Sequence, residues 1–588
     1  MIAAGQRFGF QPLALPWPDE GLRPVDLAVA RWVIAHGGSA QLAEIAARAS
    51  LADGRGDSAL RIDDPSLREA LAASALVGDA RSADAPFVID EDLFYLRRNH
   101  AHEVSVAAML QARLQLPGET AAMASDLELA GLFNQDAADG QNEQRDAVRK
   151  ALDPSLFVLT GGPGTGKTTT VLRLLMAASR RHRARHGDWP RIVLAAPTGK
   201  AAQRLGESLR NAKPGDFSAH WHEALAHVQG GEASTLHRLL RSRGTRGGYG
   251  RDSDMPIDAD VVVVDEASML DLSLLRALLA ALRPETQLVL VGDADQLDSV
   301  GTGSVLQDIV AALDGESPHL QRLRHAHRAD AALRPLNEAV RLGDAAAFRA
   351  AFSGAGAQAR HLPLRDARAL ALQVDAWSDA LLGDYRTHAI DQPVDEDDAE
   401  GIARLLAATH ARQMLCALRE GAFGAAGLNA AIEARLKPAL IGEAAAGADG
   451  PWYPGRRILV TRNDAAAGLF NGDIGLCLRS GDGRLRVWFP GNGGPPRPFN
   501  PNALPPHEPA FAMTVHKAQG SEYDEVAVLP PPRADHPLLT RQWFYTAISR
   551  ARRRLEVWGG DAAISQAIEH PARRSSGLSR RIRAVASP

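Results

Sequence analysis

One glycine-rich segment, residues 161–168, constrains the fold of this 588-residue chain more than any other feature. It matches the pattern G-x-x-x-x-G-K-[ST] and stands between a strand-like apolar run at 156–160 and a helix-like run at 169–176. In that setting glycines let backbone N–H groups turn towards an anion, and the start of the helix adds a positive partial charge. The segment therefore predicts a phosphate-binding loop at the edge of a parallel sheet.

This loop supplies most of the candidate nucleotide ligands. We expect the Lys167 amino group to reach the β- and γ-phosphates of ATP, and the Thr168 hydroxyl to coordinate Mg²⁺. The amide of Gln144, upstream of the loop, can read an adenine edge, but an ordinary surface helix explains it equally well. The predicted nucleotide-binding residues are Gln144, Gly161, Gly162, Pro163, Gly164, Thr165, Gly166, Lys167, Thr168 and Thr169.

The composition is that of an ordinary globular protein, with 45% hydrophobic and 23% charged residues. Because the net charge is −4, any DNA contact must come from local groups of residues. We find no apolar run that could cross a membrane and no secretory leader. The two cysteines, Cys416 and Cys477, cannot form a metal cage, so we expect a cytoplasmic protein.

Apolar runs at 156–160, 192–196, 261–264 and 288–291 predict strands buried on both faces of a parallel sheet, within an α/β fold. Ligands bind at the C-terminal edge of such sheets, and most of the motifs follow these runs. Strand-like runs between Gly and Pro turns predict a small antiparallel β domain after residue 445.

Acidic and amide side chains follow two of these runs. We expect Asp265 to hold Mg²⁺, Glu266 to orient and deprotonate the attacking water, and Gln296 to bridge to the γ-phosphate. Acids that cap a helix are the alternative interpretation of the first pair, and Gln296 by itself would be read as a loop residue. Two arginines far from the loop, Arg328 and Arg550, are candidates for stabilising the γ-phosphate, although either alone would be read as a surface residue.

Hydroxyl, amide and cationic groups at three further places suit a phosphodiester backbone without base readout. For each of them a helix cap, a solvated helix or a polar turn is the alternative reading. The candidate DNA-binding residues are Pro197, Thr198, Lys200, Thr235, His237, Thr514, His516 and Lys517.

The order of these motifs resembles that of superfamily 1 helicases. The residues within each motif resemble those of the RecD family, the α chain of exodeoxyribonuclease V (RecBCD). A stretch with no generic ATPase role, 415–429, and the 573–578 tail share this likeness. The other matching segments are 196–202, 264–269, 462–464, 469–473 and 514–522.

The resemblance implies two RecA-like P-loop NTPase domains, a helical N-terminal domain that docks onto a partner, and an SH3-like β domain inserted in the second RecA-like domain. It also implies ATP-driven 5′→3′ translocation on single-stranded DNA, action on duplex DNA ends together with RecB and RecC, and no nuclease site of the chain's own. The implied boundaries are 1–120 (N-terminal), 121–310 (first RecA-like, with a hairpin at about 241–256), 311–445 with 506–588 (second), and 446–505 (insert).

Two other functions fit parts of the sequence. A stand-alone RecD-like helicase would share the motifs but usually carries a longer N-terminal region with helix-hairpin-helix elements, which we do not find before residue 120. A non-motor regulatory P-loop ATPase would have a decayed site, whereas the predicted catalytic set here is complete. That set is Lys167, Glu266, Gln296, Arg328 and Arg550.

Overall fold

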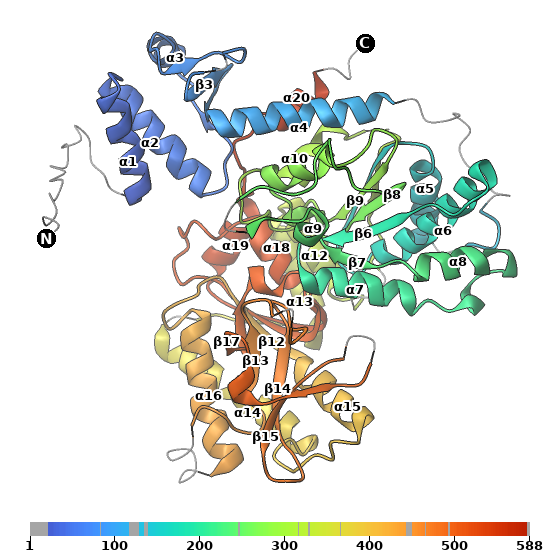
Figure 1. Cartoon of the computed structure of the whole chain (residues 1–588). Helices are drawn as coiled ribbons and strands as arrows, with labels where there is room; N and C mark the ends of the chain where they lie inside the picture. The colour runs from blue at the N-terminus through green and yellow to red at the C-terminus, as the bar shows by residue number, and fades with distance from the viewer. Residues whose placement is uncertain are drawn as a thin grey trace, which may run out of the picture.

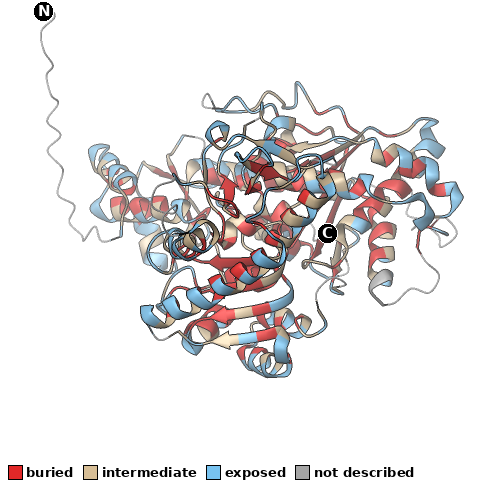
Figure 2. Ribbon diagram, turned by 90° about the horizontal axis from the view of Figure 1, so that it is seen from below, coloured by how far each residue is buried: buried red, intermediate tan, exposed pale blue. Residues whose placement is uncertain are grey.

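The computed structural model describes residues 21–584 except 83, 117–128, 134–138, 245–246, 316, 327–329, 365, 443–449, 465 and 492–493. Two parallel sheets with helices on both faces form its centre, which we call the first and second sheet domains (Figure 1). In Figure 2 the central strands are largely buried and the outer faces of the helices are exposed. No helix in the described part of the chain is both long and apolar enough to span a bilayer.

The first sheet has the strand order β10-β5-β9-β8-β6-β7, and all its pairs are parallel. Successive residues of β5 alternate between two cores: Leu156 and Val158 pack on one face, Phe157 and Leu159 on the other. This explains why the strand reads as an unbroken apolar run. The strands are β5 (Leu156–Gly161), β6 (Ile192–Ala196), β7 (Ala233–Thr235), β8 (Val261–Val264), β9 (Gln287–Gly292) and β10 (Leu320–Leu323). The helices are α5 (Asp139–Ala151), α6 (Lys167–His186), α7 (Gly199–Arg210), α8 (His222–Gln229), α9 (Leu236–Leu239), α10 (Leu272–Ala280) and α11 (Val305–Ala312).

The second sheet, β11-β20-β19-β12-β18, is also parallel throughout. Its strands are β11 (Ala359–Leu362), β12 (Arg412–Cys416), β18 (Ala512–Thr514), β19 (Tyr523–Leu529) and β20 (Ala551–Trp558). Its helices are α12 (Arg334–Leu342), α13 (Ala345–Gly354), α14 (Ala367–Thr387), α15 (Ala399–His410), α16 (Ala425–Ile441), α18 (Arg541–Ile548) and α19 (Asp561–Glu569).

An antiparallel five-stranded sheet interrupts the second sheet domain between α16 and β18, as the Gly/Pro-punctuated runs predict. We call it the β insert. Its strands are β13 (Arg457–Val460), β14 (Ile474–Arg479), β15 (Leu485–Phe489), β16 (Arg497–Phe499) and β17 (His507–Pro509), in the order β16-β15-β14-β13-β17. The SH3-like class of the insert stays a prediction.

The structure shifts two of the expected boundaries and adds a sheet to the N-terminal region. β10 pairs with β5, so the first sheet domain runs past residue 310. The region before residue 120, expected to be mostly helical with one strand-like piece at 93–96, holds a four-stranded sheet that includes this piece; its two shortest strands have two residues each and leave no readable pattern. α20 (Leu578–Arg583) packs on α4 and α11, so the C-terminal tail, 571–584, leaves the second sheet domain (Figure 1). The N-terminal elements are α1 (Pro24–Ala35), α2 (Ala40–Gly54), β1 (Leu60–Arg61), α3 (Pro65–Ala72), β2 (Val77–Gly78), β3 (Phe87–Asp90), β4 (Leu93–Leu96) and α4 (Arg97–Gln115).

Candidate nucleotide and DNA site

The phosphate-binding loop joins β5 to α6, as predicted. Gly164 and Gly166 have φ angles of 73° and 85°, in the left-handed region that side chains rarely adopt, so glycine is required at both positions. The Lys167 ammonium donates to the carbonyls of Gly161 (2.5 Å) and Gly162 (3.0 Å). Its charge is therefore held over the loop, at the start of a 20-residue helix.

Asp265 and Glu266 stand directly after β8, beside the loop. Burial and the neighbouring Glu266 raise the pKa of Asp265 to about 7, and Lys167 opposes that rise. Glu266 has a φ of 52°, an uncommon conformation for a residue with a side chain. Backbone strain of this kind is concentrated at functional sites, where the surrounding structure maintains it.

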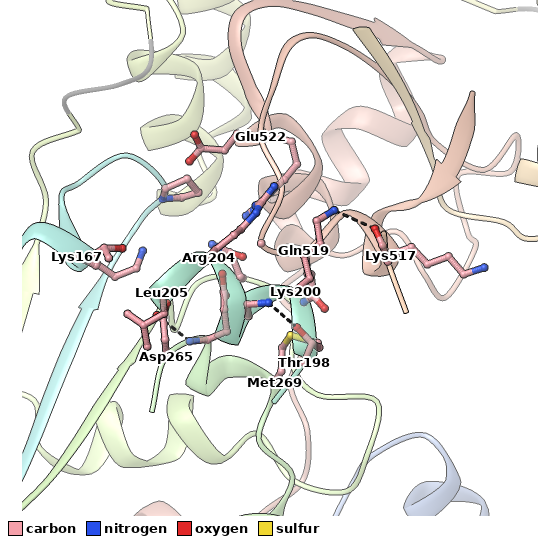
Figure 3. Close-up of a pocket in the computed structure, with 18 of the residues that line it drawn as sticks. Lys167, Thr198, Lys200, Arg204, Leu205, Asp265, Met269, Lys517, Gln519 and Glu522 are labelled. Atoms are coloured by element: carbon pink, nitrogen blue, oxygen red, sulfur yellow. Dashed lines mark hydrogen bonds between the residues drawn. The ribbon is translucent and has the colours of Figure 1, made fainter. Parts of the chain in front are cut away.

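A cleft of about 530 Å³ lies between the two sheet domains, and the β insert contributes to its wall. Figure 3 shows Lys167 and Asp265 on one side, Gln519, Glu522 and Lys517 on the other, and Arg204 between them. The predicted residues that line it are Pro163, Gly164, Thr165, Gly166, Lys167, Thr168, Thr198, Lys200, Asp265, Glu266, Gln296, His516, Lys517 and Arg550.

Arg550 enters this cleft from the second sheet domain. Its guanidinium donates to the carbonyls of Thr546 (3.0 Å) and Ser521 (3.3 Å), which fixes its direction. Among the described residues its Nη2 atom is buried without a hydrogen-bond partner. A buried cationic donor with an unused hydrogen is suited to an anion in the cleft. Arg328, the other predicted arginine, lies outside the described residues.

Two amides near the loop are bonded to neighbouring residues. Gln296, buried after β9, donates to Asp293 (2.7 Å) and still lines the cleft. Gln144 donates weakly to the Thr165 carbonyl (3.4 Å) and accepts from Arg173 (2.8 Å). The Gln144 amide thus joins the loop to Arg173 of α6, while its predicted contact with adenine stays a prediction.

The candidate DNA-binding residues divide into two groups. Four of them line the cleft, as stated above, whereas Pro197, Thr235, His237 and Thr514 are not among its lining residues in the described structure. The hydroxyls of Thr198 and Thr235 cap α7 and α9, respectively. Both threonines therefore form the helix caps that were the alternative interpretation.

Lys200 is bonded to the β insert, a contact that the sequence motifs do not reveal. Its ammonium donates to the Gly472 carbonyl (3.1 Å), and burial together with nearby Arg204 lowers its pKa to about 7. A Cβ atom at Gly199 would lie 2.7 Å from the ring of Phe470, so the insert also packs on the start of α7. Phe470 and Gly472 lie in the family-like 469–473 segment, whose sequence does not indicate its partner.

Comparison with known proteins follows the same division of the chain. A model of an AAA domain matches residues 144–302, and a model of the UvrD-like helicase C-terminal domain matches residues 509–557. The RecBCD enzyme subunit RecD of Mycolicibacterium smegmatis is 38% identical, over 96% of this chain and 95% of its own length. That of Mycobacterium tuberculosis is 37% identical over 86% of this chain and 83% of its own length. The ATP-dependent RecD2 DNA helicase of Deinococcus radiodurans is 32% identical over 84% of this chain but only 59% of its own length.

Proposed function

We propose a mechanism for a chain that belongs to the RecD family of RecBCD enzyme subunits and is an ATP-dependent superfamily 1 DNA helicase. ATP binds between the two RecA-like sheet domains, and its hydrolysis drives 5′→3′ movement along single-stranded DNA. The observation that carries the proposal is that Lys167 and Glu266 of one domain share a cleft with Arg550 of the other. Opening and closing of this cleft is the motor step.

Each of the main residues of the cleft has its own role in hydrolysis. Lys167 neutralises charge on the β- and γ-phosphates, and Glu266 takes a proton from the attacking water. Arg550 adds positive charge from the opposite wall as the cleft closes, and Arg328 is assigned the same task by resemblance. Gln296 links the γ-phosphate to the loop that follows β9.

The residues present also fit Mg²⁺. Thr168 and Asp265 offer a hydroxyl and a carboxylate oxygen in one cleft, and Mg²⁺ prefers one or two such ligands together with substrate phosphates. The raised pKa of Asp265 fits as well, because a cation beside a buried carboxylate stabilises its ionised form. When bound, the ion would neutralise charge on the phosphate oxygens.

Lys200, His516 and Lys517 reach the DNA backbone from facing domains, with hydroxyls of Thr198 and Thr514 and with Thr235 and His237 nearby. Within the cell we place the chain in the cytoplasm, bound through its N-terminal region to RecC in a complex with RecB, acting on duplex ends. A stand-alone helicase is the second candidate. The limited coverage of the Deinococcus RecD2 helicase favours the complex.

Substitution of the proposed base tests this mechanism. Glu266→Gln should retain nucleotide binding and lose DNA-stimulated ATP hydrolysis and unwinding of 5′-tailed duplex. Glu285→Gln, at an exposed position that does not line the cleft, is the matched control. Turnover near that of the unsubstituted protein in Glu266→Gln would contradict the assignment. Co-expression with RecB and RecC, followed by purification through one subunit, tests the complex.

A further inference from the structure

The C-terminal tail has a family-like sequence but no part in the mechanism above. It leaves α19, crosses the boundary between the sheet domains and ends at α20 beside α4 (Figure 1). One residue of the tail, Arg574, forms hydrogen bonds to three backbone carbonyls. Its guanidinium donates to the carbonyls of Ser299 (2.6 Å), Gly301 (2.8 Å) and Gly303 (3.1 Å).

These three carbonyls belong to the segment that follows Gln296, which we call the 297–303 loop. The carbonyls of this irregular loop have no partners in a regular helix or sheet. The planar guanidinium of Arg574 bonds to three of them and so restrains the conformation of the loop. Asp298, at the start of the loop, accepts from Ser304 (2.8 Å) and lies 3.9 Å from Arg574 Nε. The Arg574 side chain is only 17% exposed.

The same loop contacts the second sheet domain beside the ATP cleft. The Leu297 N–H donates to the Thr546 hydroxyl (2.9 Å), and the Gln519 amide donates to the Leu297 carbonyl (3.2 Å). Thr546 is also the residue whose carbonyl accepts from Arg550. A change in the shape of the 297–303 loop would therefore move Gln296 and disturb the surroundings of Arg550.

The N-terminal region supports the loop from the other side. Gly303 donates to the Gly56 carbonyl (2.8 Å), and the Thr302 hydroxyl donates to Asp53 (2.8 Å). A Cβ atom at Gly56 would lie 2.3 Å from the Arg574 guanidinium carbon, so the arginine is packed directly against this region.

We propose that Arg574 is a positioning residue for ATP hydrolysis, because it holds the 297–303 loop between the N-terminal region and the second sheet domain. Through Leu297 the loop keeps Gln296 in a fixed position relative to Thr546 and Arg550. Arg574 touches neither nucleotide nor DNA in this scheme. Its loss affects the rate of the chemical step and leaves nucleotide binding by the phosphate loop unchanged.

The test compares Arg574→Ala and Arg574→Lys with two controls in the full chain. Arg573→Ala removes the adjacent exposed arginine. Arg581→Ala breaks the ion pairs of the same tail with Asp90 and Glu103 but keeps the Arg574 side chain, and so serves as the control for a loss of stability. The readouts are kcat and KM for ATP with single-stranded DNA, affinity for a non-hydrolysable ATP analogue, and Tm.

We expect kcat to fall about tenfold or more in Arg574→Ala, since small misplacements of positioning groups cost this much, with analogue affinity within about twofold. The kcat of Arg574→Lys should fall as well, because a single ammonium nitrogen lacks the fork of two nitrogens that reaches the three carbonyls. Arg581→Ala should lower Tm and keep its kcat. Unchanged kcat in both Arg574 variants, full kcat in Arg574→Lys, or an equal kcat loss in Arg581→Ala would overturn the proposal.

Discussion

The hydroxyl of Tyr545, on α18, lies where a side chain on Gly162 of the phosphate loop would begin. A Cβ atom at Gly162 would stand 2.7 Å from that hydroxyl oxygen, and the next ring atom of Tyr545 is 4.0 Å away. Because Tyr545 is buried, it cannot swing aside. The two sheet domains thus approach each other closely at the loop, because Gly162 has no side chain and leaves room for Tyr545.

Gly162→Ala should therefore reduce ATPase activity by about tenfold or more, since the loop or α18 must move. Adding Tyr545→Phe removes the clashing oxygen and should restore part of the activity. Gly215→Ala, with no atom within 4 Å of the added carbon, is the neutral control. Steady-state ATP turnover measures the effect, and equal activity in Gly162→Ala and Gly215→Ala would contradict the close approach.

Lys167→Gln should abolish ATP hydrolysis, a loss of at least about a hundredfold, because it removes the cation that the loop carbonyls hold in place. The fold should persist, since the lost bonds are made only to carbonyls of the loop. Circular dichroism and Tm report the fold, and DNA-stimulated phosphate release reports the activity. Lys213→Gln, at an exposed position, should behave like the unsubstituted protein. Near-normal turnover in Lys167→Gln would refute the site.

Arg550→Ala should lower kcat by about a hundredfold or more while changing nucleotide affinity little, because this arginine acts when the cleft closes. Arg553→Ala, whose side chain is 76% exposed on the next strand, is the matched control. Single-turnover hydrolysis separates the chemical step from product release. A large loss of affinity with unchanged single-turnover rate would assign Arg550 to ground-state binding.

Binding of single-stranded DNA should weaken as pH rises from about 6 to 8.5 at constant salt. The pKa of Lys200 is lowered to about 7 in the free protein, and a phosphate beside it would favour the charged form. DNA binding must then take up a proton above pH 7, and proton uptake becomes costlier as pH rises. Lys200→Arg, which stays charged, should flatten the profile in a fluorescence-anisotropy titration. An unchanged slope in that variant would remove Lys200 from the DNA path.

The central strands of the first sheet were predictable because strands buried on both faces carry unbroken apolar runs, as β8 does. The edge strand β10 was not, since its sequence Leu-Gln-Arg-Leu has two polar residues in the middle. Among site residues, the phosphate loop and the Asp265–Glu266 pair could be read locally, because the residues of each motif are adjacent in the chain. Contacts from side chain to distant backbone, such as Arg574 to the 297–303 loop, leave no such pattern.

The uniform run of valines in β8 has a consequence for the two carboxylates that follow it. Sliding the strand by one residue would keep valine at three of its four positions, yet it would place Glu266 where Asp265 stands. Burial of the valines alone opposes that error only weakly, so alignment depends also on polar contacts at the strand's ends. The backbone N–H of Arg191 donates to Asp260 (2.7 Å) before the run, and that of Asp265 donates to the Ala195 carbonyl (2.9 Å) after it. The side chains of Arg191 and Asp260 also form an ion pair (2.9 Å), so the placement of the carboxylates at one end of the strand depends in part on this pair at the other.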